Sequence, residues 1–481
     1  MKKHTTKPTP EIEKQNSMYF MGCRKYFAFF MRETFRVVNP GIKFKKNWHV
    51  DLMAHYLQAV SEGKIKRLII NIPPRSMKST ITSICWPAWI IGNNPSKRII
   101  CASYSQHLSD KLSLDSRHLV KSWLFNKIFP NVKMVRDQNK KNKYMFSDRG
   151  FRFATSVGGT TTGEGGDILI LDDPHNALDV TSKKRREKSI NWFQQSFLSR
   201  LDDKKNGAIV IVMQRLHQND LTGFLLENQL QEWTVLSIPA ICQEDTTYEI
   251  NGLCYKYKKN ELLHQSREGV EEIERLKRDL GTYTFSAQYL QDPLSTNSGM
   301  IKKSWIEYYK TPSSITSYET IIQSWDTAIK SGDENSYSVC TTWGRLNGNF
   351  YLLDVYRDKA EYPTLKRKII EIYKQWNPDR ILIEDKASGQ ALLQDLKKEY
   401  HYLPLVPIKV NKDKFTRFAS VSPLFEYGRI LIDKHAAWRL EYEQEILSFP
   451  NSKHNDQVDS TSQYLNYILS ATFQKPRIRQ L

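Results

Sequence analysis

The sequence has few cysteines, no long apolar run and a shortage of acidic residues. Its six cysteines are scattered without a CxxC pair, so the sequence indicates neither a disulfide framework nor a zinc ribbon. No apolar run approaches the roughly 20 residues that a membrane span requires, and the polar N-terminus lacks the apolar stretch of a signal peptide. We therefore expect a cytoplasmic protein without a membrane anchor.

Acidic residues are outnumbered by basic ones, 52 to 71, which gives the 481-residue chain a formal net charge of +19. An excess of this kind suits a polyanionic partner such as nucleic acid, although simple solubility is the plainer explanation. The length predicts two domains, each able to bury a core of its own.

Short continuous apolar runs organise the first half of the chain. After a mainly helical segment at residues 1–62, five such runs follow at residues 67–72, 98–103, 167–173, 207–213 and 233–239, with helical segments between them. Runs of this kind are typical of strands covered on both faces, so they predict an α/β domain with a mainly parallel sheet. Residues 241–263 show no clear period and are predicted to form an inserted loop, followed by a helix at about 269–289.

The second half has a different order of elements. Three strand candidates come in a row, TIIQSWD, SYSVCTTWG and NFYLLDVY, and the last two are joined by a turn at Asn347-Gly348. Helical and strand segments then alternate, an order found in RNase H-like mixed α/β domains. We expect a first domain at residues 63–291, a linker at 292–318, a second domain at 319–472 and a basic tail at 473–481.

A phosphate-binding loop is indicated by RLIINIPPRSMKST, a strand that runs into Lys78, Ser79 and Thr80 and then into an apolar helix. In such loops backbone N–H groups cradle the phosphates, the lysine pairs with them and the hydroxyl reaches Mg²⁺. Ile72 and Met77 replace the two glycines of the usual pattern. An ordinary strand–helix junction therefore stays an alternative.

Two carboxylates strengthen the prediction of an ATPase. Asp172 and Asp173 end the strand DILILDD, where one can hold Mg²⁺ and the other can orient the attacking water. The same pair before Pro174 is also good turn chemistry, so a capping role is the alternative.

Four acidic side chains in the second half stand at the edges of apolar segments: Asp326, Glu384, Asp456 and Asp459. On an RNase H-like sheet the first two would emerge at one edge, and the last two, one helical turn apart, face the same way. Clustered acids are costly unless cations neutralise them, and two Mg²⁺ or Mn²⁺ ions would do so. Each acid alone is explained as a solvated strand end or a helix cap, but the ordered set predicts a two-metal nuclease.

Five motifs occur in the order PPRSMKS, ILILDDP, IVMQRLHQNDLTG, AQYLQDP and the four acids. In this order they resemble the large terminase subunit of tailed bacteriophages, from about residue 48 to about residue 467. The resemblance implies an N-terminal P-loop ATPase that pumps double-stranded DNA into a procapsid and a C-terminal RNase H-like endonuclease that cuts concatemeric DNA. It also implies a small terminase subunit, the portal protein and a homo-oligomeric ring as partners, in the cytoplasm of an infected or lysogenic bacterial host and transiently on the procapsid.

The resemblance also assigns roles by position. It implies that ATP is held by Arg75, Ser76, Met77, Lys78, Ser79, Thr80, Asp172 and Gln214. Ser79 and Asp172 would contact Mg²⁺, while Arg75 and Asp173 would act in catalysis. Gln214 would sense the nucleotide. In the nuclease, Asp326, Glu384, Asp456 and Asp459 would be both metal ligands and catalytic residues.

Further residues have weaker assignments. Trp48 and His49 stand where the family packs the base, although core packing is the plainer explanation for Trp48. The arginine that acts in trans is left open among Arg149, Arg152 and Arg215.

Basic residues near the predicted sites are candidates for DNA contacts. Lys386, Lys414 and Arg417 are candidate phosphate contacts in the nuclease, where Asn455 replaces a second aspartate. The basic run at residues 183–188 is a candidate in the ATPase, with a solvated helix as the alternative.

Two other functions stay open. A helicase-nuclease or recombination nuclease would need helicase motifs that the sequence does not display. A DNA-binding assembly factor with decayed sites is motivated by Ile72, Met77 and Asn455.

Overall fold

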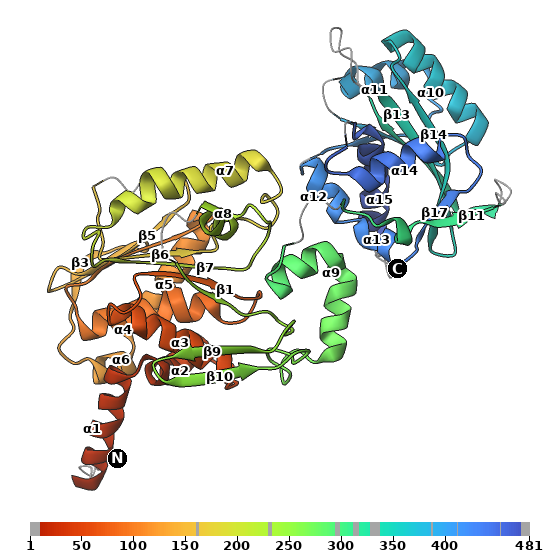
Figure 1. Ribbon diagram of the computed structural model, residues 1–481. Coiled ribbons are helices and arrows are strands. Elements are labelled where there is room, and N and C mark those ends of the chain that lie inside the picture. The colour runs from red at the N-terminus through yellow and green to blue at the C-terminus, as the bar shows by residue number, and fades with distance from the viewer. Residues whose placement is uncertain are drawn as a thin grey trace, which may run out of the picture. The chain divides into compact units, whose positions relative to one another are not determined.

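The computed structural model describes residues 10–159, 163–228, 233–293, 299–310, 317–327, 337–385, 388–410, 412–452 and 454–472. The chain divides into two compact units (Figure 1). The first unit comprises Met1–Glu274 with Phe285–Leu294, and the second comprises Arg275–Thr284 with Ser295–Leu481. Among the described residues, no helix combines the length and the apolar character needed to cross a membrane.

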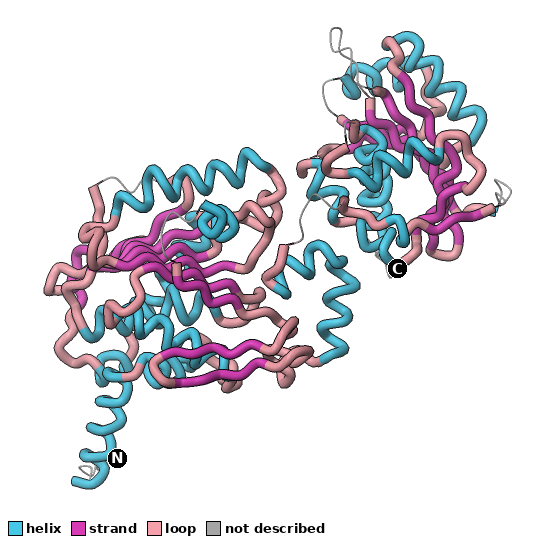
Figure 2. Tube along the Cα trace, in the orientation of Figure 1, coloured by secondary structure: helices cyan, strands magenta, loops and turns pink. Residues whose placement is uncertain are grey.

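An eight-stranded sheet forms the centre of the first unit, in the order β3-β4-β5-β2-β6-β7-β1-β8 (Figure 2). Its strands are β1 (Arg67–Asn71), β2 (Arg98–Ser103), β3 (Met134–Asn139), β4 (Lys143–Phe146), β5 (Phe151–Ser156), β6 (Ile168–Asp172), β7 (Ala208–Met213) and β8 (Thr234–Ser237). All neighbours from β5 to β8 are parallel, while β3 and β4 pair antiparallel at one edge. The prediction of a mainly parallel sheet is therefore confirmed.

Helices cover both faces of this sheet. The helices of the first unit are α1 (Pro10–Lys25), α2 (Phe27–Val38), α3 (Trp48–Ser61), α4 (Trp86–Asn93), α5 (Gln106–Lys121), α6 (Trp123–Ile128), α7 (Lys183–Trp192) and α8 (Leu221–Asn228), and α9 (Val270–Leu290) is divided between the two units. Figure 1 shows α7 and α8 on one face and α3, α4 and α5 on the other. Alternate residues of β1 enter two cores, Leu68 and Ile70 on the face of α3–α5 and Ile69 on the face of α7. Burial on both faces explains why these strands are continuously apolar.

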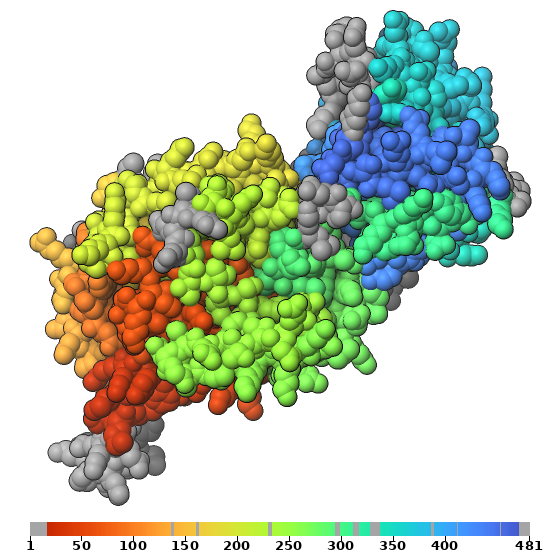
Figure 3. All heavy atoms as spheres, viewed as in Figure 1, coloured from red at the N-terminus to blue at the C-terminus, as the bar shows by residue number. Residues whose placement is uncertain are grey.

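The predicted inserted loop at 241–263 is wrong, because it contains the antiparallel hairpin β9 (Thr246–Ile250) and β10 (Leu253–Tyr257). Its turn places Asn251 and Gly252 at φ of 50° and 79°, the left-handed conformations that a tight hairpin turn requires. The hairpin lies on the surface beside the N-terminal helices (Figure 3). Its Tyr248 and Tyr257 pack on Trp48, with ring centroids 5.8 and 5.0 Å away.

The second unit has a seven-stranded mixed sheet in the order β11-β17-β14-β13-β12-β15-β16. Its strands are β11 (Glu307–Tyr309), β12 (Thr320–Asp326), β13 (Ser338–Leu346), β14 (Asn349–Asp358), β15 (Arg380–Glu384), β16 (Leu405–Ile408) and β17 (Ile430–Asp433). As predicted, β12, β13 and β14 are antiparallel in sequence, and Asn347 and Gly348 turn between the last two with φ of 49° and 74°. Strands β15 and β16 continue the sheet in parallel with β12.

Helices pack on both faces of the second sheet as well. They are α10 (Tyr362–Trp376), α11 (Ser388–Glu399), α12 (Lys414–Ala419), α13 (Ser422–Glu426), α14 (Arg439–Ser448) and α15 (Asp456–Thr472). One core joins the sheet to α12–α15 and another joins it to α10 and α11. Helix α15 is fixed to the sheet through Gln463, whose Nε2 donates to Ser324 Oγ at 3.0 Å and to the carbonyl of Leu382 at 3.4 Å.

Candidate functional site

The loop after β1 has an unusual backbone. Arg75 and Met77 adopt φ of 62° and 63°, a left-handed conformation that side chains other than glycine rarely take. A π-helical turn, Thr80–Cys85, follows before α4 begins. The loop thus keeps the positive φ at residue 77, where the family pattern has glycine, although a methionine occupies the position. Strain of this kind is typical of functional loops.

Lys78 lies at the centre of a polar cluster beneath this loop. Its ammonium is buried, 3.1 Å from Asp173 Oδ2 and 3.4 Å from Gln214 Oε1. These partners follow β6 and β7, and the three strands β6, β7 and β1 are adjacent and parallel. The structure therefore brings the predicted residues together where the carboxyl ends of three strands meet, the usual ligand position in such sheets.

Asp172 accepts hydrogen bonds from Ser79 Oγ at 3.0 Å and from Ser83 Oγ at 2.6 Å. Burial and the charge of Asp173 raise the pKa of Asp172 to about 6, against the opposing effects of Lys78 and the two hydroxyls. Ser83 was not predicted, because a serine one turn into an apolar helix carries no motif of its own. Ser79 and Asp172 are oxygen donors of the kind that Mg²⁺ prefers.

A pocket of about 1080 Å³ opens over the loop. Its lining includes six basic side chains, Lys43, Lys45, Arg75, Lys78, Lys111 and Arg267, against three acidic ones, Asp115, Asp173 and Glu268. Apolar side chains, among them Phe35, Val38 and Ile42, complete the wall. A basic floor beside an apolar wall is suited to a ligand with a polyphosphate and a flat base.

The adjacent residues Trp48 and His49 have different environments in the structure. Trp48 packs under the hairpin, as the plainer explanation expected, whereas His49 lines the pocket. Burial, together with His264 and Arg267, lowers the pKa of His49 to about 3, so its imidazole is neutral. Ser76 is buried and Thr80 lines the pocket, and the carbonyl of Arg75 accepts a hydrogen bond from Arg267.

The three arginines considered for action in trans differ in environment. Arg152 is fully buried and donates to the carbonyl of Ser83 at 3.0 Å. Arg215 is held by Asp220, at 3.1 and 3.0 Å from its two carboxylate oxygens. Arg149 is exposed in the turn between β4 and β5.

The segment after Gln214 is tightly fixed. The buried carboxylate of Asp220 accepts the backbone N–H groups of Leu216 and Gly223 at 3.0 and 2.9 Å. The N–H of Arg215 donates to Gln291 Oε1 at 3.0 Å. The residue that the resemblance assigns to nucleotide sensing therefore begins a segment with defined hydrogen-bond partners.

In the second unit the predicted acids gather at one edge of the sheet. Trp325 of β12 pairs with Ile383 of β15, so Asp326 and Glu384 follow as neighbours at the ends of these strands. Burial raises the pKa of Asp326 well above its usual range, and the charges of Asp459, Asp456 and Glu384 add to this effect. The four acids are therefore close enough to repel one another.

Lys414 and Arg417 of α12 face this acidic cluster. Both contact the carboxylate of Asp459, Arg417 at 2.5 Å, and Lys414 also donates to Asn455 Oδ1 at 2.6 Å. Burial lowers the pKa of Lys414, but Asp459, Asp326 and Asp456 outweigh it and the pKa is raised overall. The third phosphate candidate in this region, Lys386, lies outside the described residues.

The acidic cluster suits a divalent metal by its donor atoms but not by their arrangement. Its hard carboxylate oxygens suit Mg²⁺ or Mn²⁺. Within the described ranges, however, no three His, Cys, Asp or Glu side chains are arranged to hold a metal ion, and two cations already neutralise Asp459. Asp326, Glu384, Asp456 and Asp459 therefore fit a metal by donor type, with Lys414 in competition.

Glu445 is a residue that the sequence did not reveal. It is buried, and its Oε1 accepts the N–H groups of Gln457 and Val458 at 2.7 and 3.2 Å, while Oε2 accepts from Gln457 Nε2 at 2.7 Å. This side chain caps the start of α15 from another helix and so positions Asp456 and Asp459. Only the tertiary fold brings it there.

Comparisons with known proteins bear on both units. Residues 323–467 match the family model described as the terminase RNaseH-like domain. No curated protein sequence matches the chain.

Among solved structures, the large terminase of a thermophilic bacteriophage matches with a TM-score of 0.50 and 12% identity, over 86% of this chain and 98% of that one. The same terminase in complex with ADP gives a TM-score of 0.49 at 12% identity over the same shares. The magnesium-bound nuclease of the large terminase from the thermophilic phage G20c covers 36% of this chain and 96% of that one, with 13% identity and a TM-score of 0.28. Residues 323–467 therefore match the terminase RNase H-like domain family, and the chain as a whole shares the fold of a large terminase subunit.

Proposed function

We propose that this chain is the motor and nuclease subunit of a viral DNA-packaging machine. It hydrolyses ATP to move double-stranded DNA into a procapsid, and it cuts concatemeric DNA with a metal-dependent endonuclease. The observation that carries the proposal is the meeting of Lys78, Ser79, Asp172, Asp173 and Gln214 at the ends of three adjacent strands, beside a large basic pocket.

In the ATPase, Lys78 gives up its contacts with Asp173 and Gln214 and binds the nucleotide phosphates instead. The released Asp173 then orients the attacking water. The loss of the Lys78 contact at Gln214 is transmitted to the segment that follows Gln214 in the chain. Ser79 and Asp172 would hold Mg²⁺, which would supply positive charge against the phosphates. Arg75 lies on the pocket wall, where its charge is available to the transferring phosphoryl group.

In the nuclease, Asp326, Glu384, Asp456 and Asp459 would hold two Mg²⁺ or Mn²⁺ ions. Such ions activate water and stabilise the leaving oxygen of a phosphodiester. Glu445 fixes the helix that carries two of the acids. Lys414 would contact the phosphate after Lys414 releases Asp459.

The partners follow from this function. A packaging motor of this type works on double-stranded DNA with a small terminase subunit and the portal protein, as a ring of copies on the procapsid, in the cytoplasm of the bacterial host. The net charge of +19 supports the DNA partner, because sequence-independent binding rests on phosphate contacts.

Two variants of the full chain test the two activities separately. Lys78→Ala should abolish ATP turnover and leave Mg²⁺-dependent nicking of plasmid DNA largely intact, and Asp326→Ala should do the reverse. Each variant is the folding control for the other. Loss of both activities in either variant would argue against separate sites, and an inactive but folded wild type would favour a DNA-binding assembly factor. Unwinding of a tailed duplex would favour a helicase-nuclease.

A further inference from the structure

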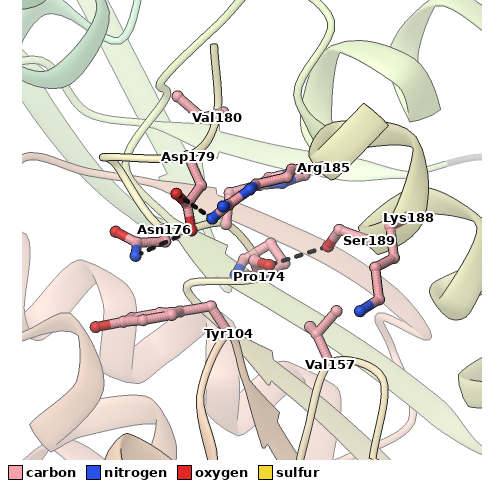
Figure 4. A pocket seen from close by; sticks show the side chains of 10 residues that line it. Tyr104, Val157, Pro174, Asn176, Asp179, Val180, Arg185, Lys188 and Ser189 are labelled. Atoms are coloured by element: carbon pink, nitrogen blue, oxygen red, sulfur yellow. Dashed lines mark hydrogen bonds and ion pairs between the residues drawn. The ribbon is translucent and has the colours of Figure 1, made fainter. Parts of the chain in front are cut away.

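A second pocket, of about 400 Å³, lies at the same edge of the first sheet as the nucleotide site (Figure 4). Tyr104 and Val157 follow β2 and β5, and the segment Pro174–Val180 follows the carboxylates at the end of β6. Helix α7 closes the pocket with Arg185, Lys188 and Ser189. The proposed hydrolysis does not use this pocket.

The charges around the pocket are not balanced. Arg185 pairs with Asp179, and Lys183 pairs with Glu187 at 3.8 Å. Lys188 has no ion-pair partner among the residues that the structure describes, and Figure 4 shows its ammonium on the side of the cavity opposite Tyr104. Five of the six residues 183–188 are basic, so the mouth of the pocket attracts anions.

We propose that this pocket binds a backbone phosphate of double-stranded DNA, with Lys188 as its cation. Across the cavity from Lys188, Tyr104, which is 40% exposed, offers a hydroxyl, and Asn176 offers an amide whose Nδ2 also donates to Asp179 Oδ2 at 3.3 Å. Lysine, tyrosine and asparagine are side chains that commonly contact phosphate without reading sequence. The inference rests on the proposed function in one respect, namely that DNA is the substrate of the motor.

The floor of the pocket connects directly to the ATPase cluster. Ser189 Oγ of α7 donates to the carbonyl of Pro174 at 2.9 Å, and Pro174 follows Asp173, whose carboxylate contacts Lys78. On the other side, His175 Nε2 accepts the N–H of Leu221 at 2.9 Å. A phosphate held by Lys188 therefore contacts the segment that carries the water-orienting carboxylate, and DNA binding changes ATP turnover through this segment.

The test compares Lys188→Ala with Lys184→Ala in the full chain. Lys184 is exposed on the same helix and does not line the pocket, so the two variants lose the same charge. Both are made in an Asp326→Ala background to prevent cleavage. Binding to a short blunt-ended duplex is measured as a function of salt, and ATP turnover is measured with and without that duplex.

Lys188→Ala should weaken DNA binding about three- to tenfold and lower the slope of log affinity against log salt by about one, the change expected for one lost phosphate contact. It should also reduce the effect of DNA on ATP turnover, while turnover without DNA stays unchanged. Lys184→Ala should show less than about twofold change in affinity. Equal effects of the two variants, or none, would overturn the pocket assignment but leave the proposed function standing. A wild type that fails to bind DNA would overturn the proposed function itself.

Discussion

Replacing Lys414 by methionine should tighten metal binding to the nuclease unit. Lys414 contacts Asp459, whose side chain is 4% exposed, while the lysine side chain is 46% exposed. A pair of unit charges 4 Å apart is worth about 4 kcal/mol at an effective dielectric constant of about 20. Because the lysine is half in water, we discount this to about 1–2 kcal/mol. A metal that displaces the lysine must overcome that energy, so its loss should lower the dissociation constant roughly five- to thirtyfold.

The assay is titration calorimetry of Mn²⁺ into the full chain without nucleotide. Heat that disappears in Asp326→Asn belongs to the nuclease site. Lys412→Met is the matched control, since Lys412 is exposed two residues away and removes the same charge at longer range. Unchanged or weaker Mn²⁺ binding by Lys414→Met would refute the competition between lysine and metal. An equal gain in Mn²⁺ affinity for Lys412→Met would show that only the net charge of the chain matters.

Three further outcomes are expected in the first unit. Met77→Gly should keep ATP turnover. Met77→Val should lower turnover and destabilise the protein by about 1–3 kcal/mol in thermal unfolding, because a β-branched residue tolerates positive φ poorly. Equal turnover and stability of the two variants would contradict a strained loop. Burial lowers the pKa of His175 to about 4, so the unfolded chain takes up the proton first as pH falls below about 6.5 and stability is lost. His175→Gln, whose amide oxygen can still accept the N–H of Leu221, should lose roughly 2 kcal/mol less than wild type between pH 7 and pH 5 in urea unfolding, and an identical loss would contradict a buried neutral imidazole. Ser83→Ala removes the 2.6 Å hydrogen bond to Asp172 and should raise the pKa of that carboxyl by about one to two units, moving the acid limb of the ATPase pH profile upward; an unmoved limb would argue against Asp172 as the titrating group.

Sequence patterns predicted the central strands and one edge strand of each sheet, β8 and β16, but missed β3, β4 and β5 at the other edge of the first sheet and β11 and β17 at the other edge of the second. Strand β7 has all six residues buried, and its apolar run is unambiguous. Strand β4 alternates between half-buried and buried positions over only four residues, and four residues are too few to establish a period. The hairpin β9–β10 carried a recognisable signal in Asn251-Gly252, but its mostly polar, half-exposed strands resembled a loop.

The candidate sites show a similar division. Motif order indicated Lys78 and Asp172, and strand register brings Asp326 beside Glu384, as an RNase H-like sheet requires. The partners that hold these groups have no sequence signature, because Glu445 reaches α15 only through tertiary packing. The ion pairs on Asp459 were also beyond prediction: a lysine on a separate helix reads equally well as a DNA contact or as a solvated charge.

The hydrogen bond from the Arg215 N–H to Gln291 links the segment after β7 to the end of α9. Gln291 is 6% exposed and sits in a left-handed conformation at the end of α9, three residues before the chain leaves the first unit at Leu294. The backbone next to Gln214 and the exit of the polypeptide are therefore held together at one buried joint. A change in the contact between Lys78 and Gln214 is therefore only one residue and one hydrogen bond away from the end of α9.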